Sequence, residues 1–181
     1  MEVTKIRKVT ICWEQISNAI NLGELHPGDR LTIADSDWKV LDIESGKALI
    51  WKCTNIENHV FNKDDSNNYE GSDIQKYLQT EFKKNIAEEM LQVITEEGFF
   101  LLTVEQIKKY MPCEIDRIAT DDDGDTVWYW TASPYVGSGH HVRIILPSGY
   151  VGNISACLSR GVAPACWLNL TSRAGDAADE G

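Results

Sequence analysis

The sequence predicts a mixed α+β domain in which several helices pack on antiparallel β-hairpins. Three patterns indicate this class: apolar residues that alternate around a turn near residue 45, two capping motifs that open apolar helical stripes between residues 72 and 112, and a strand-rich stretch from Asp125 onward. The chain has 181 residues, is 43% hydrophobic and contains six tryptophans, so it can bury a substantial core.

The chain is expected to divide into an N-terminal helical segment (residues 1–30), an α+β domain (residues 31–170) and a disordered tail (residues 171–181). In the first segment, apolar residues between Trp13 and Ile20 stand at helical spacing before a glycine that can end the helix. The tail is small and polar and contains no core residues.

Residues 38–53 predict a β-hairpin. Apolar side chains alternate before and after the turn sequence ESGK, which we interpret as a four-residue connection. Because both faces are largely apolar near the turn, we expect the hairpin to be covered on both sides.

The middle of the chain predicts helices that begin at two capping boxes. A polar loop, Asn62–Ser72, leads into SDIQ, in which the Ser72 hydroxyl can accept from the amide of Gln75 while the Gln75 side chain reaches back. A second helical piece follows at residues 86–94. EEGFFLLT then predicts a short, fully apolar strand, and TVEQ opens a helix that ends before Pro112.

From Asp125 onward the pattern is typical of strands. In WYWTASP, Trp128 and Trp130 should share one face of a strand and point into the core, with Tyr129 on the other face. HVRIILPSGYVGNIS predicts two strands joined at PSG. Pro164 interrupts GVAPACWLNL, so this last element is expected to be an edge strand or to contain a bulge.

The charge argues against one class of function and leaves two interpretations open. A formal net charge of −11 opposes direct binding to nucleic acid, which needs clustered Lys and Arg. The acidic surface either keeps the protein soluble or competes for a basic groove on a partner. No apolar run approaches the ~20 residues of a membrane helix, and the start lacks a signal-peptide core, so we expect a soluble, cytoplasmic protein without membrane contact.

The residue patterns predict neither a catalytic nor a metal-binding site. Ser133 lacks the G-x-S-x-G turn of a nucleophile elbow. His140 and His141 are neighbours and would point to opposite faces of a strand, so they cannot easily chelate one metal. The five cysteines contain no CxxC motif; Cys157 and Cys166 could approach each other across the C-terminal strands, but packing is favoured for them. We therefore expect no catalytic residue, metal or cofactor.

The acidic stretch DDDGD matches only the start of an EF-hand loop. The position that requires glycine is Thr126, so a solvated acidic turn is favoured over a calcium site.

The remaining candidates are binding residues. Tyr135 and Tyr150 are flanked by Gly and Ser, a mixture that resembles adaptable binding loops. One of the two adjacent histidines is expected to face solvent and the other to meet a ligand. The expected binding residues are Tyr135, Ser138, His140, His141, Tyr150, Asn153, Asp121, Asp122, Asp123 and Asp125.

Several motifs occur in an order that resembles a known family. They are GSDIQKYLQTEF, FFLLTVEQIKKYMP, RIAT, WYWTASP, ILPSGYV and GVAPACWLNL, and the similarity spans about Trp38 to Leu170. This order resembles the DUF6273 family of uncharacterised domains from Firmicutes and their phages. The resemblance implies a C-type-lectin-like α+β fold, akin to formylglycine-generating enzymes and to the variable proteins of diversity-generating retroelements. In such a fold, C-terminal strands and loops display a ligand-binding face.

The chain departs from the family pattern at two positions. Ala132 and Ala163 stand where the family commonly has arginine, so a shared site that depends on those arginines would be lost here. The EPN and WND motifs of C-type lectins are absent, and calcium-dependent sugar binding does not transfer. No copper-binding cysteine pair can be mapped either.

Several functions remain open after these observations. The first is a non-enzymatic domain that binds a protein through the loops between Trp130 and Gly161. A specialised version is an acidic phage or mobile-element inhibitor of a host nucleic-acid enzyme, such as an anti-CRISPR protein that binds the Cas9–guide RNA complex; charge, size and the resemblance suggest it. The alternatives are a lectin-like module for an unknown ligand and an oxidase-like enzyme that uses Cys157 or Cys166.

Overall fold

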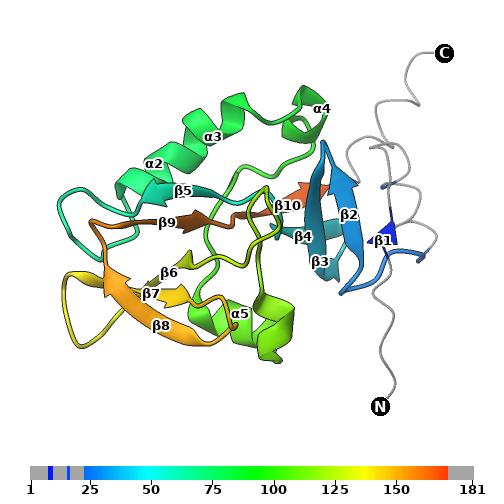
Figure 1. The fold of residues 1–181 in the computed structure, drawn as a ribbon. Coiled ribbons are helices and arrows are strands. Elements are labelled where there is room, and N and C mark those ends of the chain that lie inside the picture. The colour runs from blue at the N-terminus through cyan, green and yellow to red at the C-terminus, as the bar shows by residue number, and fades with distance from the viewer. Residues whose placement is uncertain (1–7, 10–15, 17–22, 171–181) are drawn as a thin grey trace.

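The computed structural model describes residues 8–9, 16 and 23–170, which form a mixed α+β fold (Figure 1). Two five-stranded, mostly antiparallel sheets make up its centre, and short helices pack around them. The expected α+β class is therefore confirmed. The helix expected around Trp13 and the tail at 171–181 lie outside the described residues. Among the described residues, no helix has the length and apolar character needed to cross a membrane.

The first sheet has the strand order β1-β2-β3-β4-β10. Its strands are β1 (Lys8–Val9), β2 (Arg30–Ile33), β3 (Ser36–Glu44), β4 (Lys47–Lys52) and β10 (Ala165–Asn169). β3 and β4 form the expected hairpin, in which Glu44 pairs with Lys47. The connection is therefore two residues, Ser45 and Gly46, rather than four. Both have the positive φ, 49° and 74°, that a tight hairpin turn requires.

The second sheet has the strand order β5-β9-β6-β7-β8. Its strands are β5 (Glu57–Val60), β6 (Tyr129–Pro134), β7 (His141–Ile145), β8 (Val151–Ser155) and β9 (Ser159–Val162). β7 and β8 are the hairpin expected around PSG. β6 and β9 run parallel and meet at Tyr129 and Gly161, where the Gly161 N–H donates to the Trp128 carbonyl at 2.8 Å.

Pro164 marks the point where the chain passes from one sheet to the other. β9 lies in the interior of the second sheet, whereas β10 lies on the edge of the first. Pro164 has no N–H to donate, and its carbonyl accepts a hydrogen bond from the Lys52 N–H at 2.9 Å. The element expected at the end of the domain is thus two strands, and the expected edge position is correct for β10.

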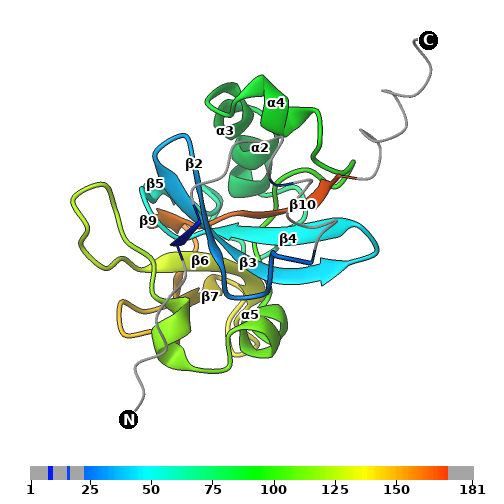
Figure 2. The same cartoon turned by 90° about the vertical axis from the view of Figure 1, so that its right-hand side faces the viewer.

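Helices lie on two opposite sides of the sheets (Figure 2). On one side are α2 (Asp73–Gln79), α3 (Glu81–Lys84) and α4 (Glu88–Leu91), and on the other is α5 (Val104–Tyr110), which the 3₁₀ helix η1 (Glu114–Arg117) follows.

Both expected helix starts are confirmed. The Ser72 hydroxyl accepts from the Gln75 N–H at 3.2 Å, although the Gln75 side chain bonds to the N–H of Gly71 instead of that of Ser72. Thr103 and Gln106 form a complete capping box at the start of α5. These local bonds satisfy N–H groups that the first helical turn leaves without partners.

The segment at residues 96–103 is not the strand that its apolar pattern predicts. It contacts the first sheet through an isolated bridge between Phe100 and Ala165. The next N–H, that of Leu101, donates to the Tyr69 hydroxyl, and the Leu102 carbonyl accepts from the Ala132 N–H. Because consecutive backbone groups of this segment bond to different parts of the fold, they do not form a ladder.

Two clusters of buried side chains make up the core. The larger cluster includes Trp38 and Trp130, and the second includes Trp51 and Tyr129. Tyr129 and Trp130 are consecutive and each is 1% exposed, because β6 is covered on both faces and its two sides belong to different clusters.

The prediction that Trp128 shares the buried face of Trp130 is wrong. Trp128 is 41% exposed and precedes the first residue of β6, so the alternation of a strand does not extend to it. The Arg160 guanidinium lies over its ring, 5.7 Å from the ring centre. The aromatic side chain therefore lies at the surface, where it contacts a cation on β9.

Candidate functional site

Asn67 holds the loop that connects β6 to β7. Its side-chain amide donates to the carbonyl oxygens of Tyr135, Ser138 and His141 at 3.3, 2.8 and 3.1 Å, and its backbone N–H donates to the Gly139 carbonyl at 3.0 Å. The amide has two hydrogens, so the three side-chain bonds share them. One residue of the polar loop at 62–72 thus contacts four backbone carbonyl groups of the loop at 135–141.

Four side chains beside this loop form a surface that we call the loop face: Tyr135, His141, Arg143 and Asn153. The pairing of β7 with β8 places Arg143 directly opposite Asn153. The Arg143 guanidinium lies 4.7 Å from the centre of the Tyr135 ring, and His141 Nδ1 lies 2.8 Å from Asn153 Oδ1. The side chains therefore contact one another in pairs across the outer side of the hairpin.

Asp65 joins three loops next to the loop face. Its carboxylate accepts from the Ser155 hydroxyl at 2.5 Å and from the Cys157 N–H at 3.1 Å, and its backbone carbonyl lies 2.9 Å from His140 Nδ1. The hydrogen bond from the Ser155 hydroxyl is the largest cause that lowers the pKa of the Asp65 carboxyl below its ordinary value of 3.8. Desolvation opposes it, and the Cys157 N–H and thiol add to the lowering. These bonds connect the loops at 62–72 and 135–141 to the turn between β8 and β9.

The lowered pKa of Asp65 predicts a loss of stability in acid. A carboxyl group with a depressed native pKa stabilises the fold above its unfolded-state pKa, and that contribution is lost as the pH falls through the native value. We expect the stability advantage of the wild type over Asp65→Asn to shrink as the pH falls below 3.8. Urea denaturation at several pH values measures it. Ser155→Ala removes the largest cause of the shift, so an unchanged pH dependence in that variant would contradict this explanation.

Cys157 and Cys166 do not form the paired site that the sequence left open. Cys166 is fully buried in β10 of the first sheet, and Cys157 is exposed in the turn after β8 of the second. Burial raises the pKa of the Cys166 thiol. The Cys157 sulfur lies 3.2 Å from the Ser155 hydroxyl and next to the Asp65 carboxylate. A positive charge beside the sulfur would favour the reactive thiolate, and the neighbours named here are a hydroxyl and a negatively charged carboxylate.

Maleimide labelling checks this description of the cysteines. We expect the exposed Cys113 and Cys157 to be modified in the native protein, and the buried Cys53 and Cys166 to be modified only after unfolding. Peptide mapping by mass spectrometry assigns each modification to its residue. Labelling of native Cys166 at the same rate as Cys157 would contradict the burial of Cys166. It would also favour the hypothesis of a cysteine-dependent oxidase.

The expected binding residues fall into separate regions. Tyr135, Ser138, His140, His141 and Asn153 gather at the loop face or in the loops next to it. The two histidines bond to different partners, Asp65 and Asn153, as expected for neighbours that diverge.

Tyr150 lies at the opposite end of the β7–β8 hairpin. It is 61% exposed and follows the turn at Gly149, whereas the loop face lies at the end where His141 pairs with Ser155. The five-residue strands between them span about 15 Å. Tyr150 is therefore at the surface, as expected, but outside the loop face.

The acidic turn lies beyond the other end of β6. Asp121 Oδ1 accepts from the N–H groups of Asp123 and Asp125 at 3.0 and 2.9 Å, so this carboxylate forms hydrogen bonds that stabilise the turn. Carboxylate oxygens of Asp121, Asp122 and Asp123 lie within 4.8 Å of one another and are largely open to solvent. The geometry is that of a solvated acidic turn.

Sequence reasoning missed three residues of this site. Asn67 and Asp65 stand in a stretch that reads only as a polar loop, and Arg143 reads only as a polar position on a strand. The unusual density of Asn and Asp in the loop was the available signal, because these side chains bond readily to backbone groups. Their partners could not be identified from it.

Comparison with known families gives one match, and it covers the strands of the loop face. Residues 101–170 match the DUF6273 family model, a domain of unknown function. This match supports the family assignment. Comparisons with curated proteins and with solved structures gave no match. The DUF6273 segment extends from the start of α5 to the end of β10 and contains Tyr135, Arg143 and Asn153, whereas Asn67 precedes it.

Ala132 and Ala163, the two positions where the resemblance leads us to expect arginine, lie in different parts of the core. Ala163 is 2% exposed and belongs to the second core cluster, and its carbonyl accepts from the indole N–H of Trp51 at 3.1 Å. Ala132 packs against the larger cluster, and its N–H donates to the Leu102 carbonyl at 2.9 Å.

Proposed function

We propose that this protein is a non-enzymatic recognition domain that binds another protein through the loop face. The observation that carries the proposal is the brace formed by Asn67, which holds three carbonyl groups of the loop between β6 and β7. A loop that is already ordered loses less conformational freedom when a partner binds.

The residue types at the loop face favour recognition. Tyr135 and Arg143 stack on each other, and tyrosine and arginine are enriched among the residues that dominate protein–protein binding energies. Val136, at the tip of the loop, is 96% exposed and offers an apolar contact. A Cβ atom at Gly137 would lie 2.7 Å from the Tyr135 ring, so the glycine lets this ring fold back against the loop.

The proposal includes the C-type-lectin-like identity that the resemblance implies. It is supported by the position of the loop face, which lies at the end of the strands β6, β7 and β8 in the C-terminal part of the domain. The absence of catalysis is part of the proposal as well, and the surroundings of Cys157 support it.

For the partner, we propose a basic nucleic-acid enzyme, with the Cas9–guide RNA complex as the first to be tested. The net charge of −11 supports this choice, because an acidic domain can compete for a groove that binds phosphates. Such an inhibitor acts in the cytoplasm, where guide complexes assemble.

Binding of the immobilised Cas9–guide RNA complex tests the proposal. Tyr135→Ala should weaken binding at least about tenfold, because the ring contacts two other residues of the loop face, Arg143 and His141. Asn67→Ala should also weaken it, since an unbraced loop must be ordered on binding. Tyr150→Ala is the matched control: it removes an exposed tyrosine from the far end of the same hairpin and should leave affinity and Tm unchanged.

Two outcomes would contradict different parts of the proposal. Absence of retention at low salt would exclude the Cas9–guide RNA complex as partner. Equal losses for Tyr135→Ala and Tyr150→Ala would contradict the location of the face. Peptides displayed in a library, selected on the wild type and screened again on both variants, test the loop face independently of Cas9.

A further inference from the structure

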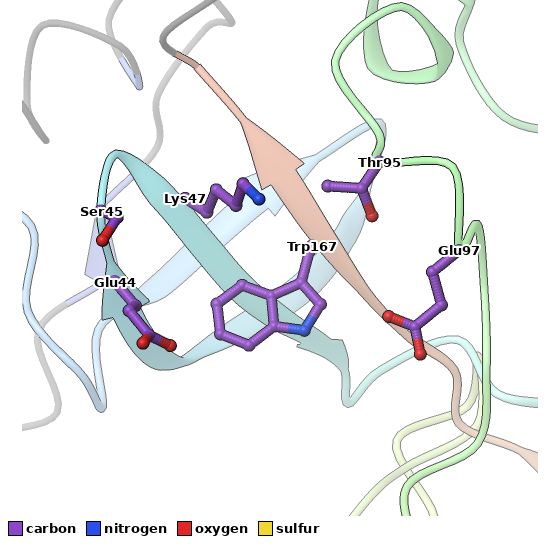
Figure 3. Close-up of a pocket in the computed structure, with 6 residues that line it drawn as sticks. All are labelled: Glu44, Ser45, Lys47, Thr95, Glu97 and Trp167. Atoms are coloured by element: carbon purple, nitrogen blue, oxygen red, sulfur yellow. The ribbon is translucent and has the colours of Figure 1, made fainter.

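A hollow of about 400 Å³ lies over Trp167 at the edge of the first sheet, apart from the loop face on the second sheet. The tip of the β3–β4 hairpin, the edge strand β10 and the loop after α4 surround it. Figure 3 shows the Trp167 indole as the floor, with Glu44 on one side and Glu97 on the other.

The indole is only partly covered because the first sheet extends beyond the segment that packs on it. In β10, Cys166 and Leu168 point into the larger core cluster, so Ala165 and Trp167 share the opposite face. Phe100 forms a bridge with Ala165 and covers that position. Trp167, two residues farther along, packs on the second cluster but remains half-buried. A large aromatic face therefore borders an open hollow.

Acidic groups dominate the rim of this hollow. Glu44 and Glu97 line it, Glu96 lines the hollow that adjoins it, and Lys47 is the only cation among the described lining residues. Within the described ranges, neither Glu44 nor Glu97 forms an ion pair with a basic side chain. Both carboxylates are thus available to a ligand with a positive charge.

We infer that this hollow binds the guanidinium group of an arginine side chain on a basic protein partner. A planar guanidinium can stack on the indole face, and its N–H groups can donate to carboxylates at the edges of the ring. Trp167 provides the stacking surface, and Glu44 and Glu97 provide the acceptors on both sides. The acidic charge of the whole chain, −11, favours the approach of a basic segment.

This site is separate from the loop face and goes beyond the function proposed for it. It involves no residue of the second sheet, so either site can exist without the other.

Titration with short peptides, followed by the NMR resonance of the Trp167 indole N–H, tests the inference. The probes are Ac-Gly-Arg-Gly-NH2 and the same peptide with citrulline, which keeps the shape of arginine but has no charge. We expect the arginine peptide to shift the Trp167 resonance with saturation and to bind at least about fivefold more tightly than the citrulline peptide. Added salt should weaken the arginine peptide alone.

Variants that remove an acidic or a basic side chain of the hollow should change the affinity for the arginine peptide in opposite directions. Glu97→Gln should weaken the arginine peptide about threefold or more, and Lys47→Gln should strengthen it, because it removes the competing cation of the hollow. Glu70→Gln is the matched control: it makes the same change on the exposed loop before α2 and should have little effect. Equal binding of arginine and citrulline, equal effects of Glu97→Gln and Glu70→Gln, or no shift of the Trp167 resonance would each overturn the inference.

Discussion

Gly149→Ala is expected to lower the free energy of unfolding by about 4 kcal/mol, because it adds a steric clash to an unfavourable backbone conformation. Gly149 has a φ of +87° in the turn between β7 and β8. A Cβ atom there would lie 2.0 Å from the carbonyl oxygen of Glu114, at the start of η1. The atom it meets belongs to the backbone, so the clash can be relieved only if η1 or the hairpin moves. Urea denaturation of the purified variant measures the loss.

Gly124→Ala separates the two causes. Gly124 has nearly the same φ, +86°, in the acidic turn, but a Cβ atom there would have no neighbour within 4 Å. This variant should lose only about 1 kcal/mol, the cost of a left-handed conformation for alanine. Equal losses at both positions would show that a Cβ atom at residue 149 meets no added steric penalty from Glu114. That result would contradict the close contact between the two residues in this structure.

Arg117→Met should destabilise the protein by about 3 kcal/mol, since it removes the donor from several buried acceptors. Arg117 is 5% exposed and donates to the carbonyl groups of Met111, Pro112 and Gly149 at 2.8, 2.8 and 3.3 Å. It therefore connects the end of α5 to the β7–β8 turn. Methionine preserves much of the apolar stem, so the measured loss reports mainly the hydrogen bonds of the guanidinium group.

Lys84→Met is the matched control for Arg117. Lys84 forms a 2.9 Å ion pair with Glu81 on α3, and both side chains are more than 60% exposed. Exposed pairs contribute little, so the unfolding free energy should change by less than about 0.5 kcal/mol. A similar loss in both variants would indicate that removal of any positive charge from this acidic chain destabilises it, and would contradict a specific role of the Arg117 bonds.

The elements that the sequence predicted correctly are those whose cause is local. The caps at Ser72 and Thr103 depend on hydrogen bonds across three residues, and the β3–β4 hairpin depends on a turn that accepts positive φ at Ser45 and Gly46. Interactions of such short range depend only on residues that are close together in the sequence, so a sequence pattern can reveal them without knowledge of the fold.

The errors arose where distant contacts override a local pattern. The apolar stretch around Phe100 has the composition of a strand, but its backbone bonds go to Tyr69, Ala132 and Ala165. The alternating pattern predicts that Trp128 is buried, but the strand begins one residue later, at Tyr129. The Trp128 ring therefore lies at the surface, with the Arg160 guanidinium over it. In both cases the hydrophobic pattern indicated apolar side chains but not which neighbours would cover them.

The sequence by itself determined the α+β class, the two capped helices and the loop that carries Tyr135. The tertiary structure alone decided that this loop is hydrogen-bonded to a distant part of the chain, because its brace, Asn67, is 68 to 74 residues away from the carbonyl groups that it holds. The same is true of the hollow over Trp167, where the β3–β4 hairpin, β10 and the loop after α4 meet. A hydrogen bond or an aromatic contact depends on distance in space, and at such separations only the packing of the whole domain determines which residues meet.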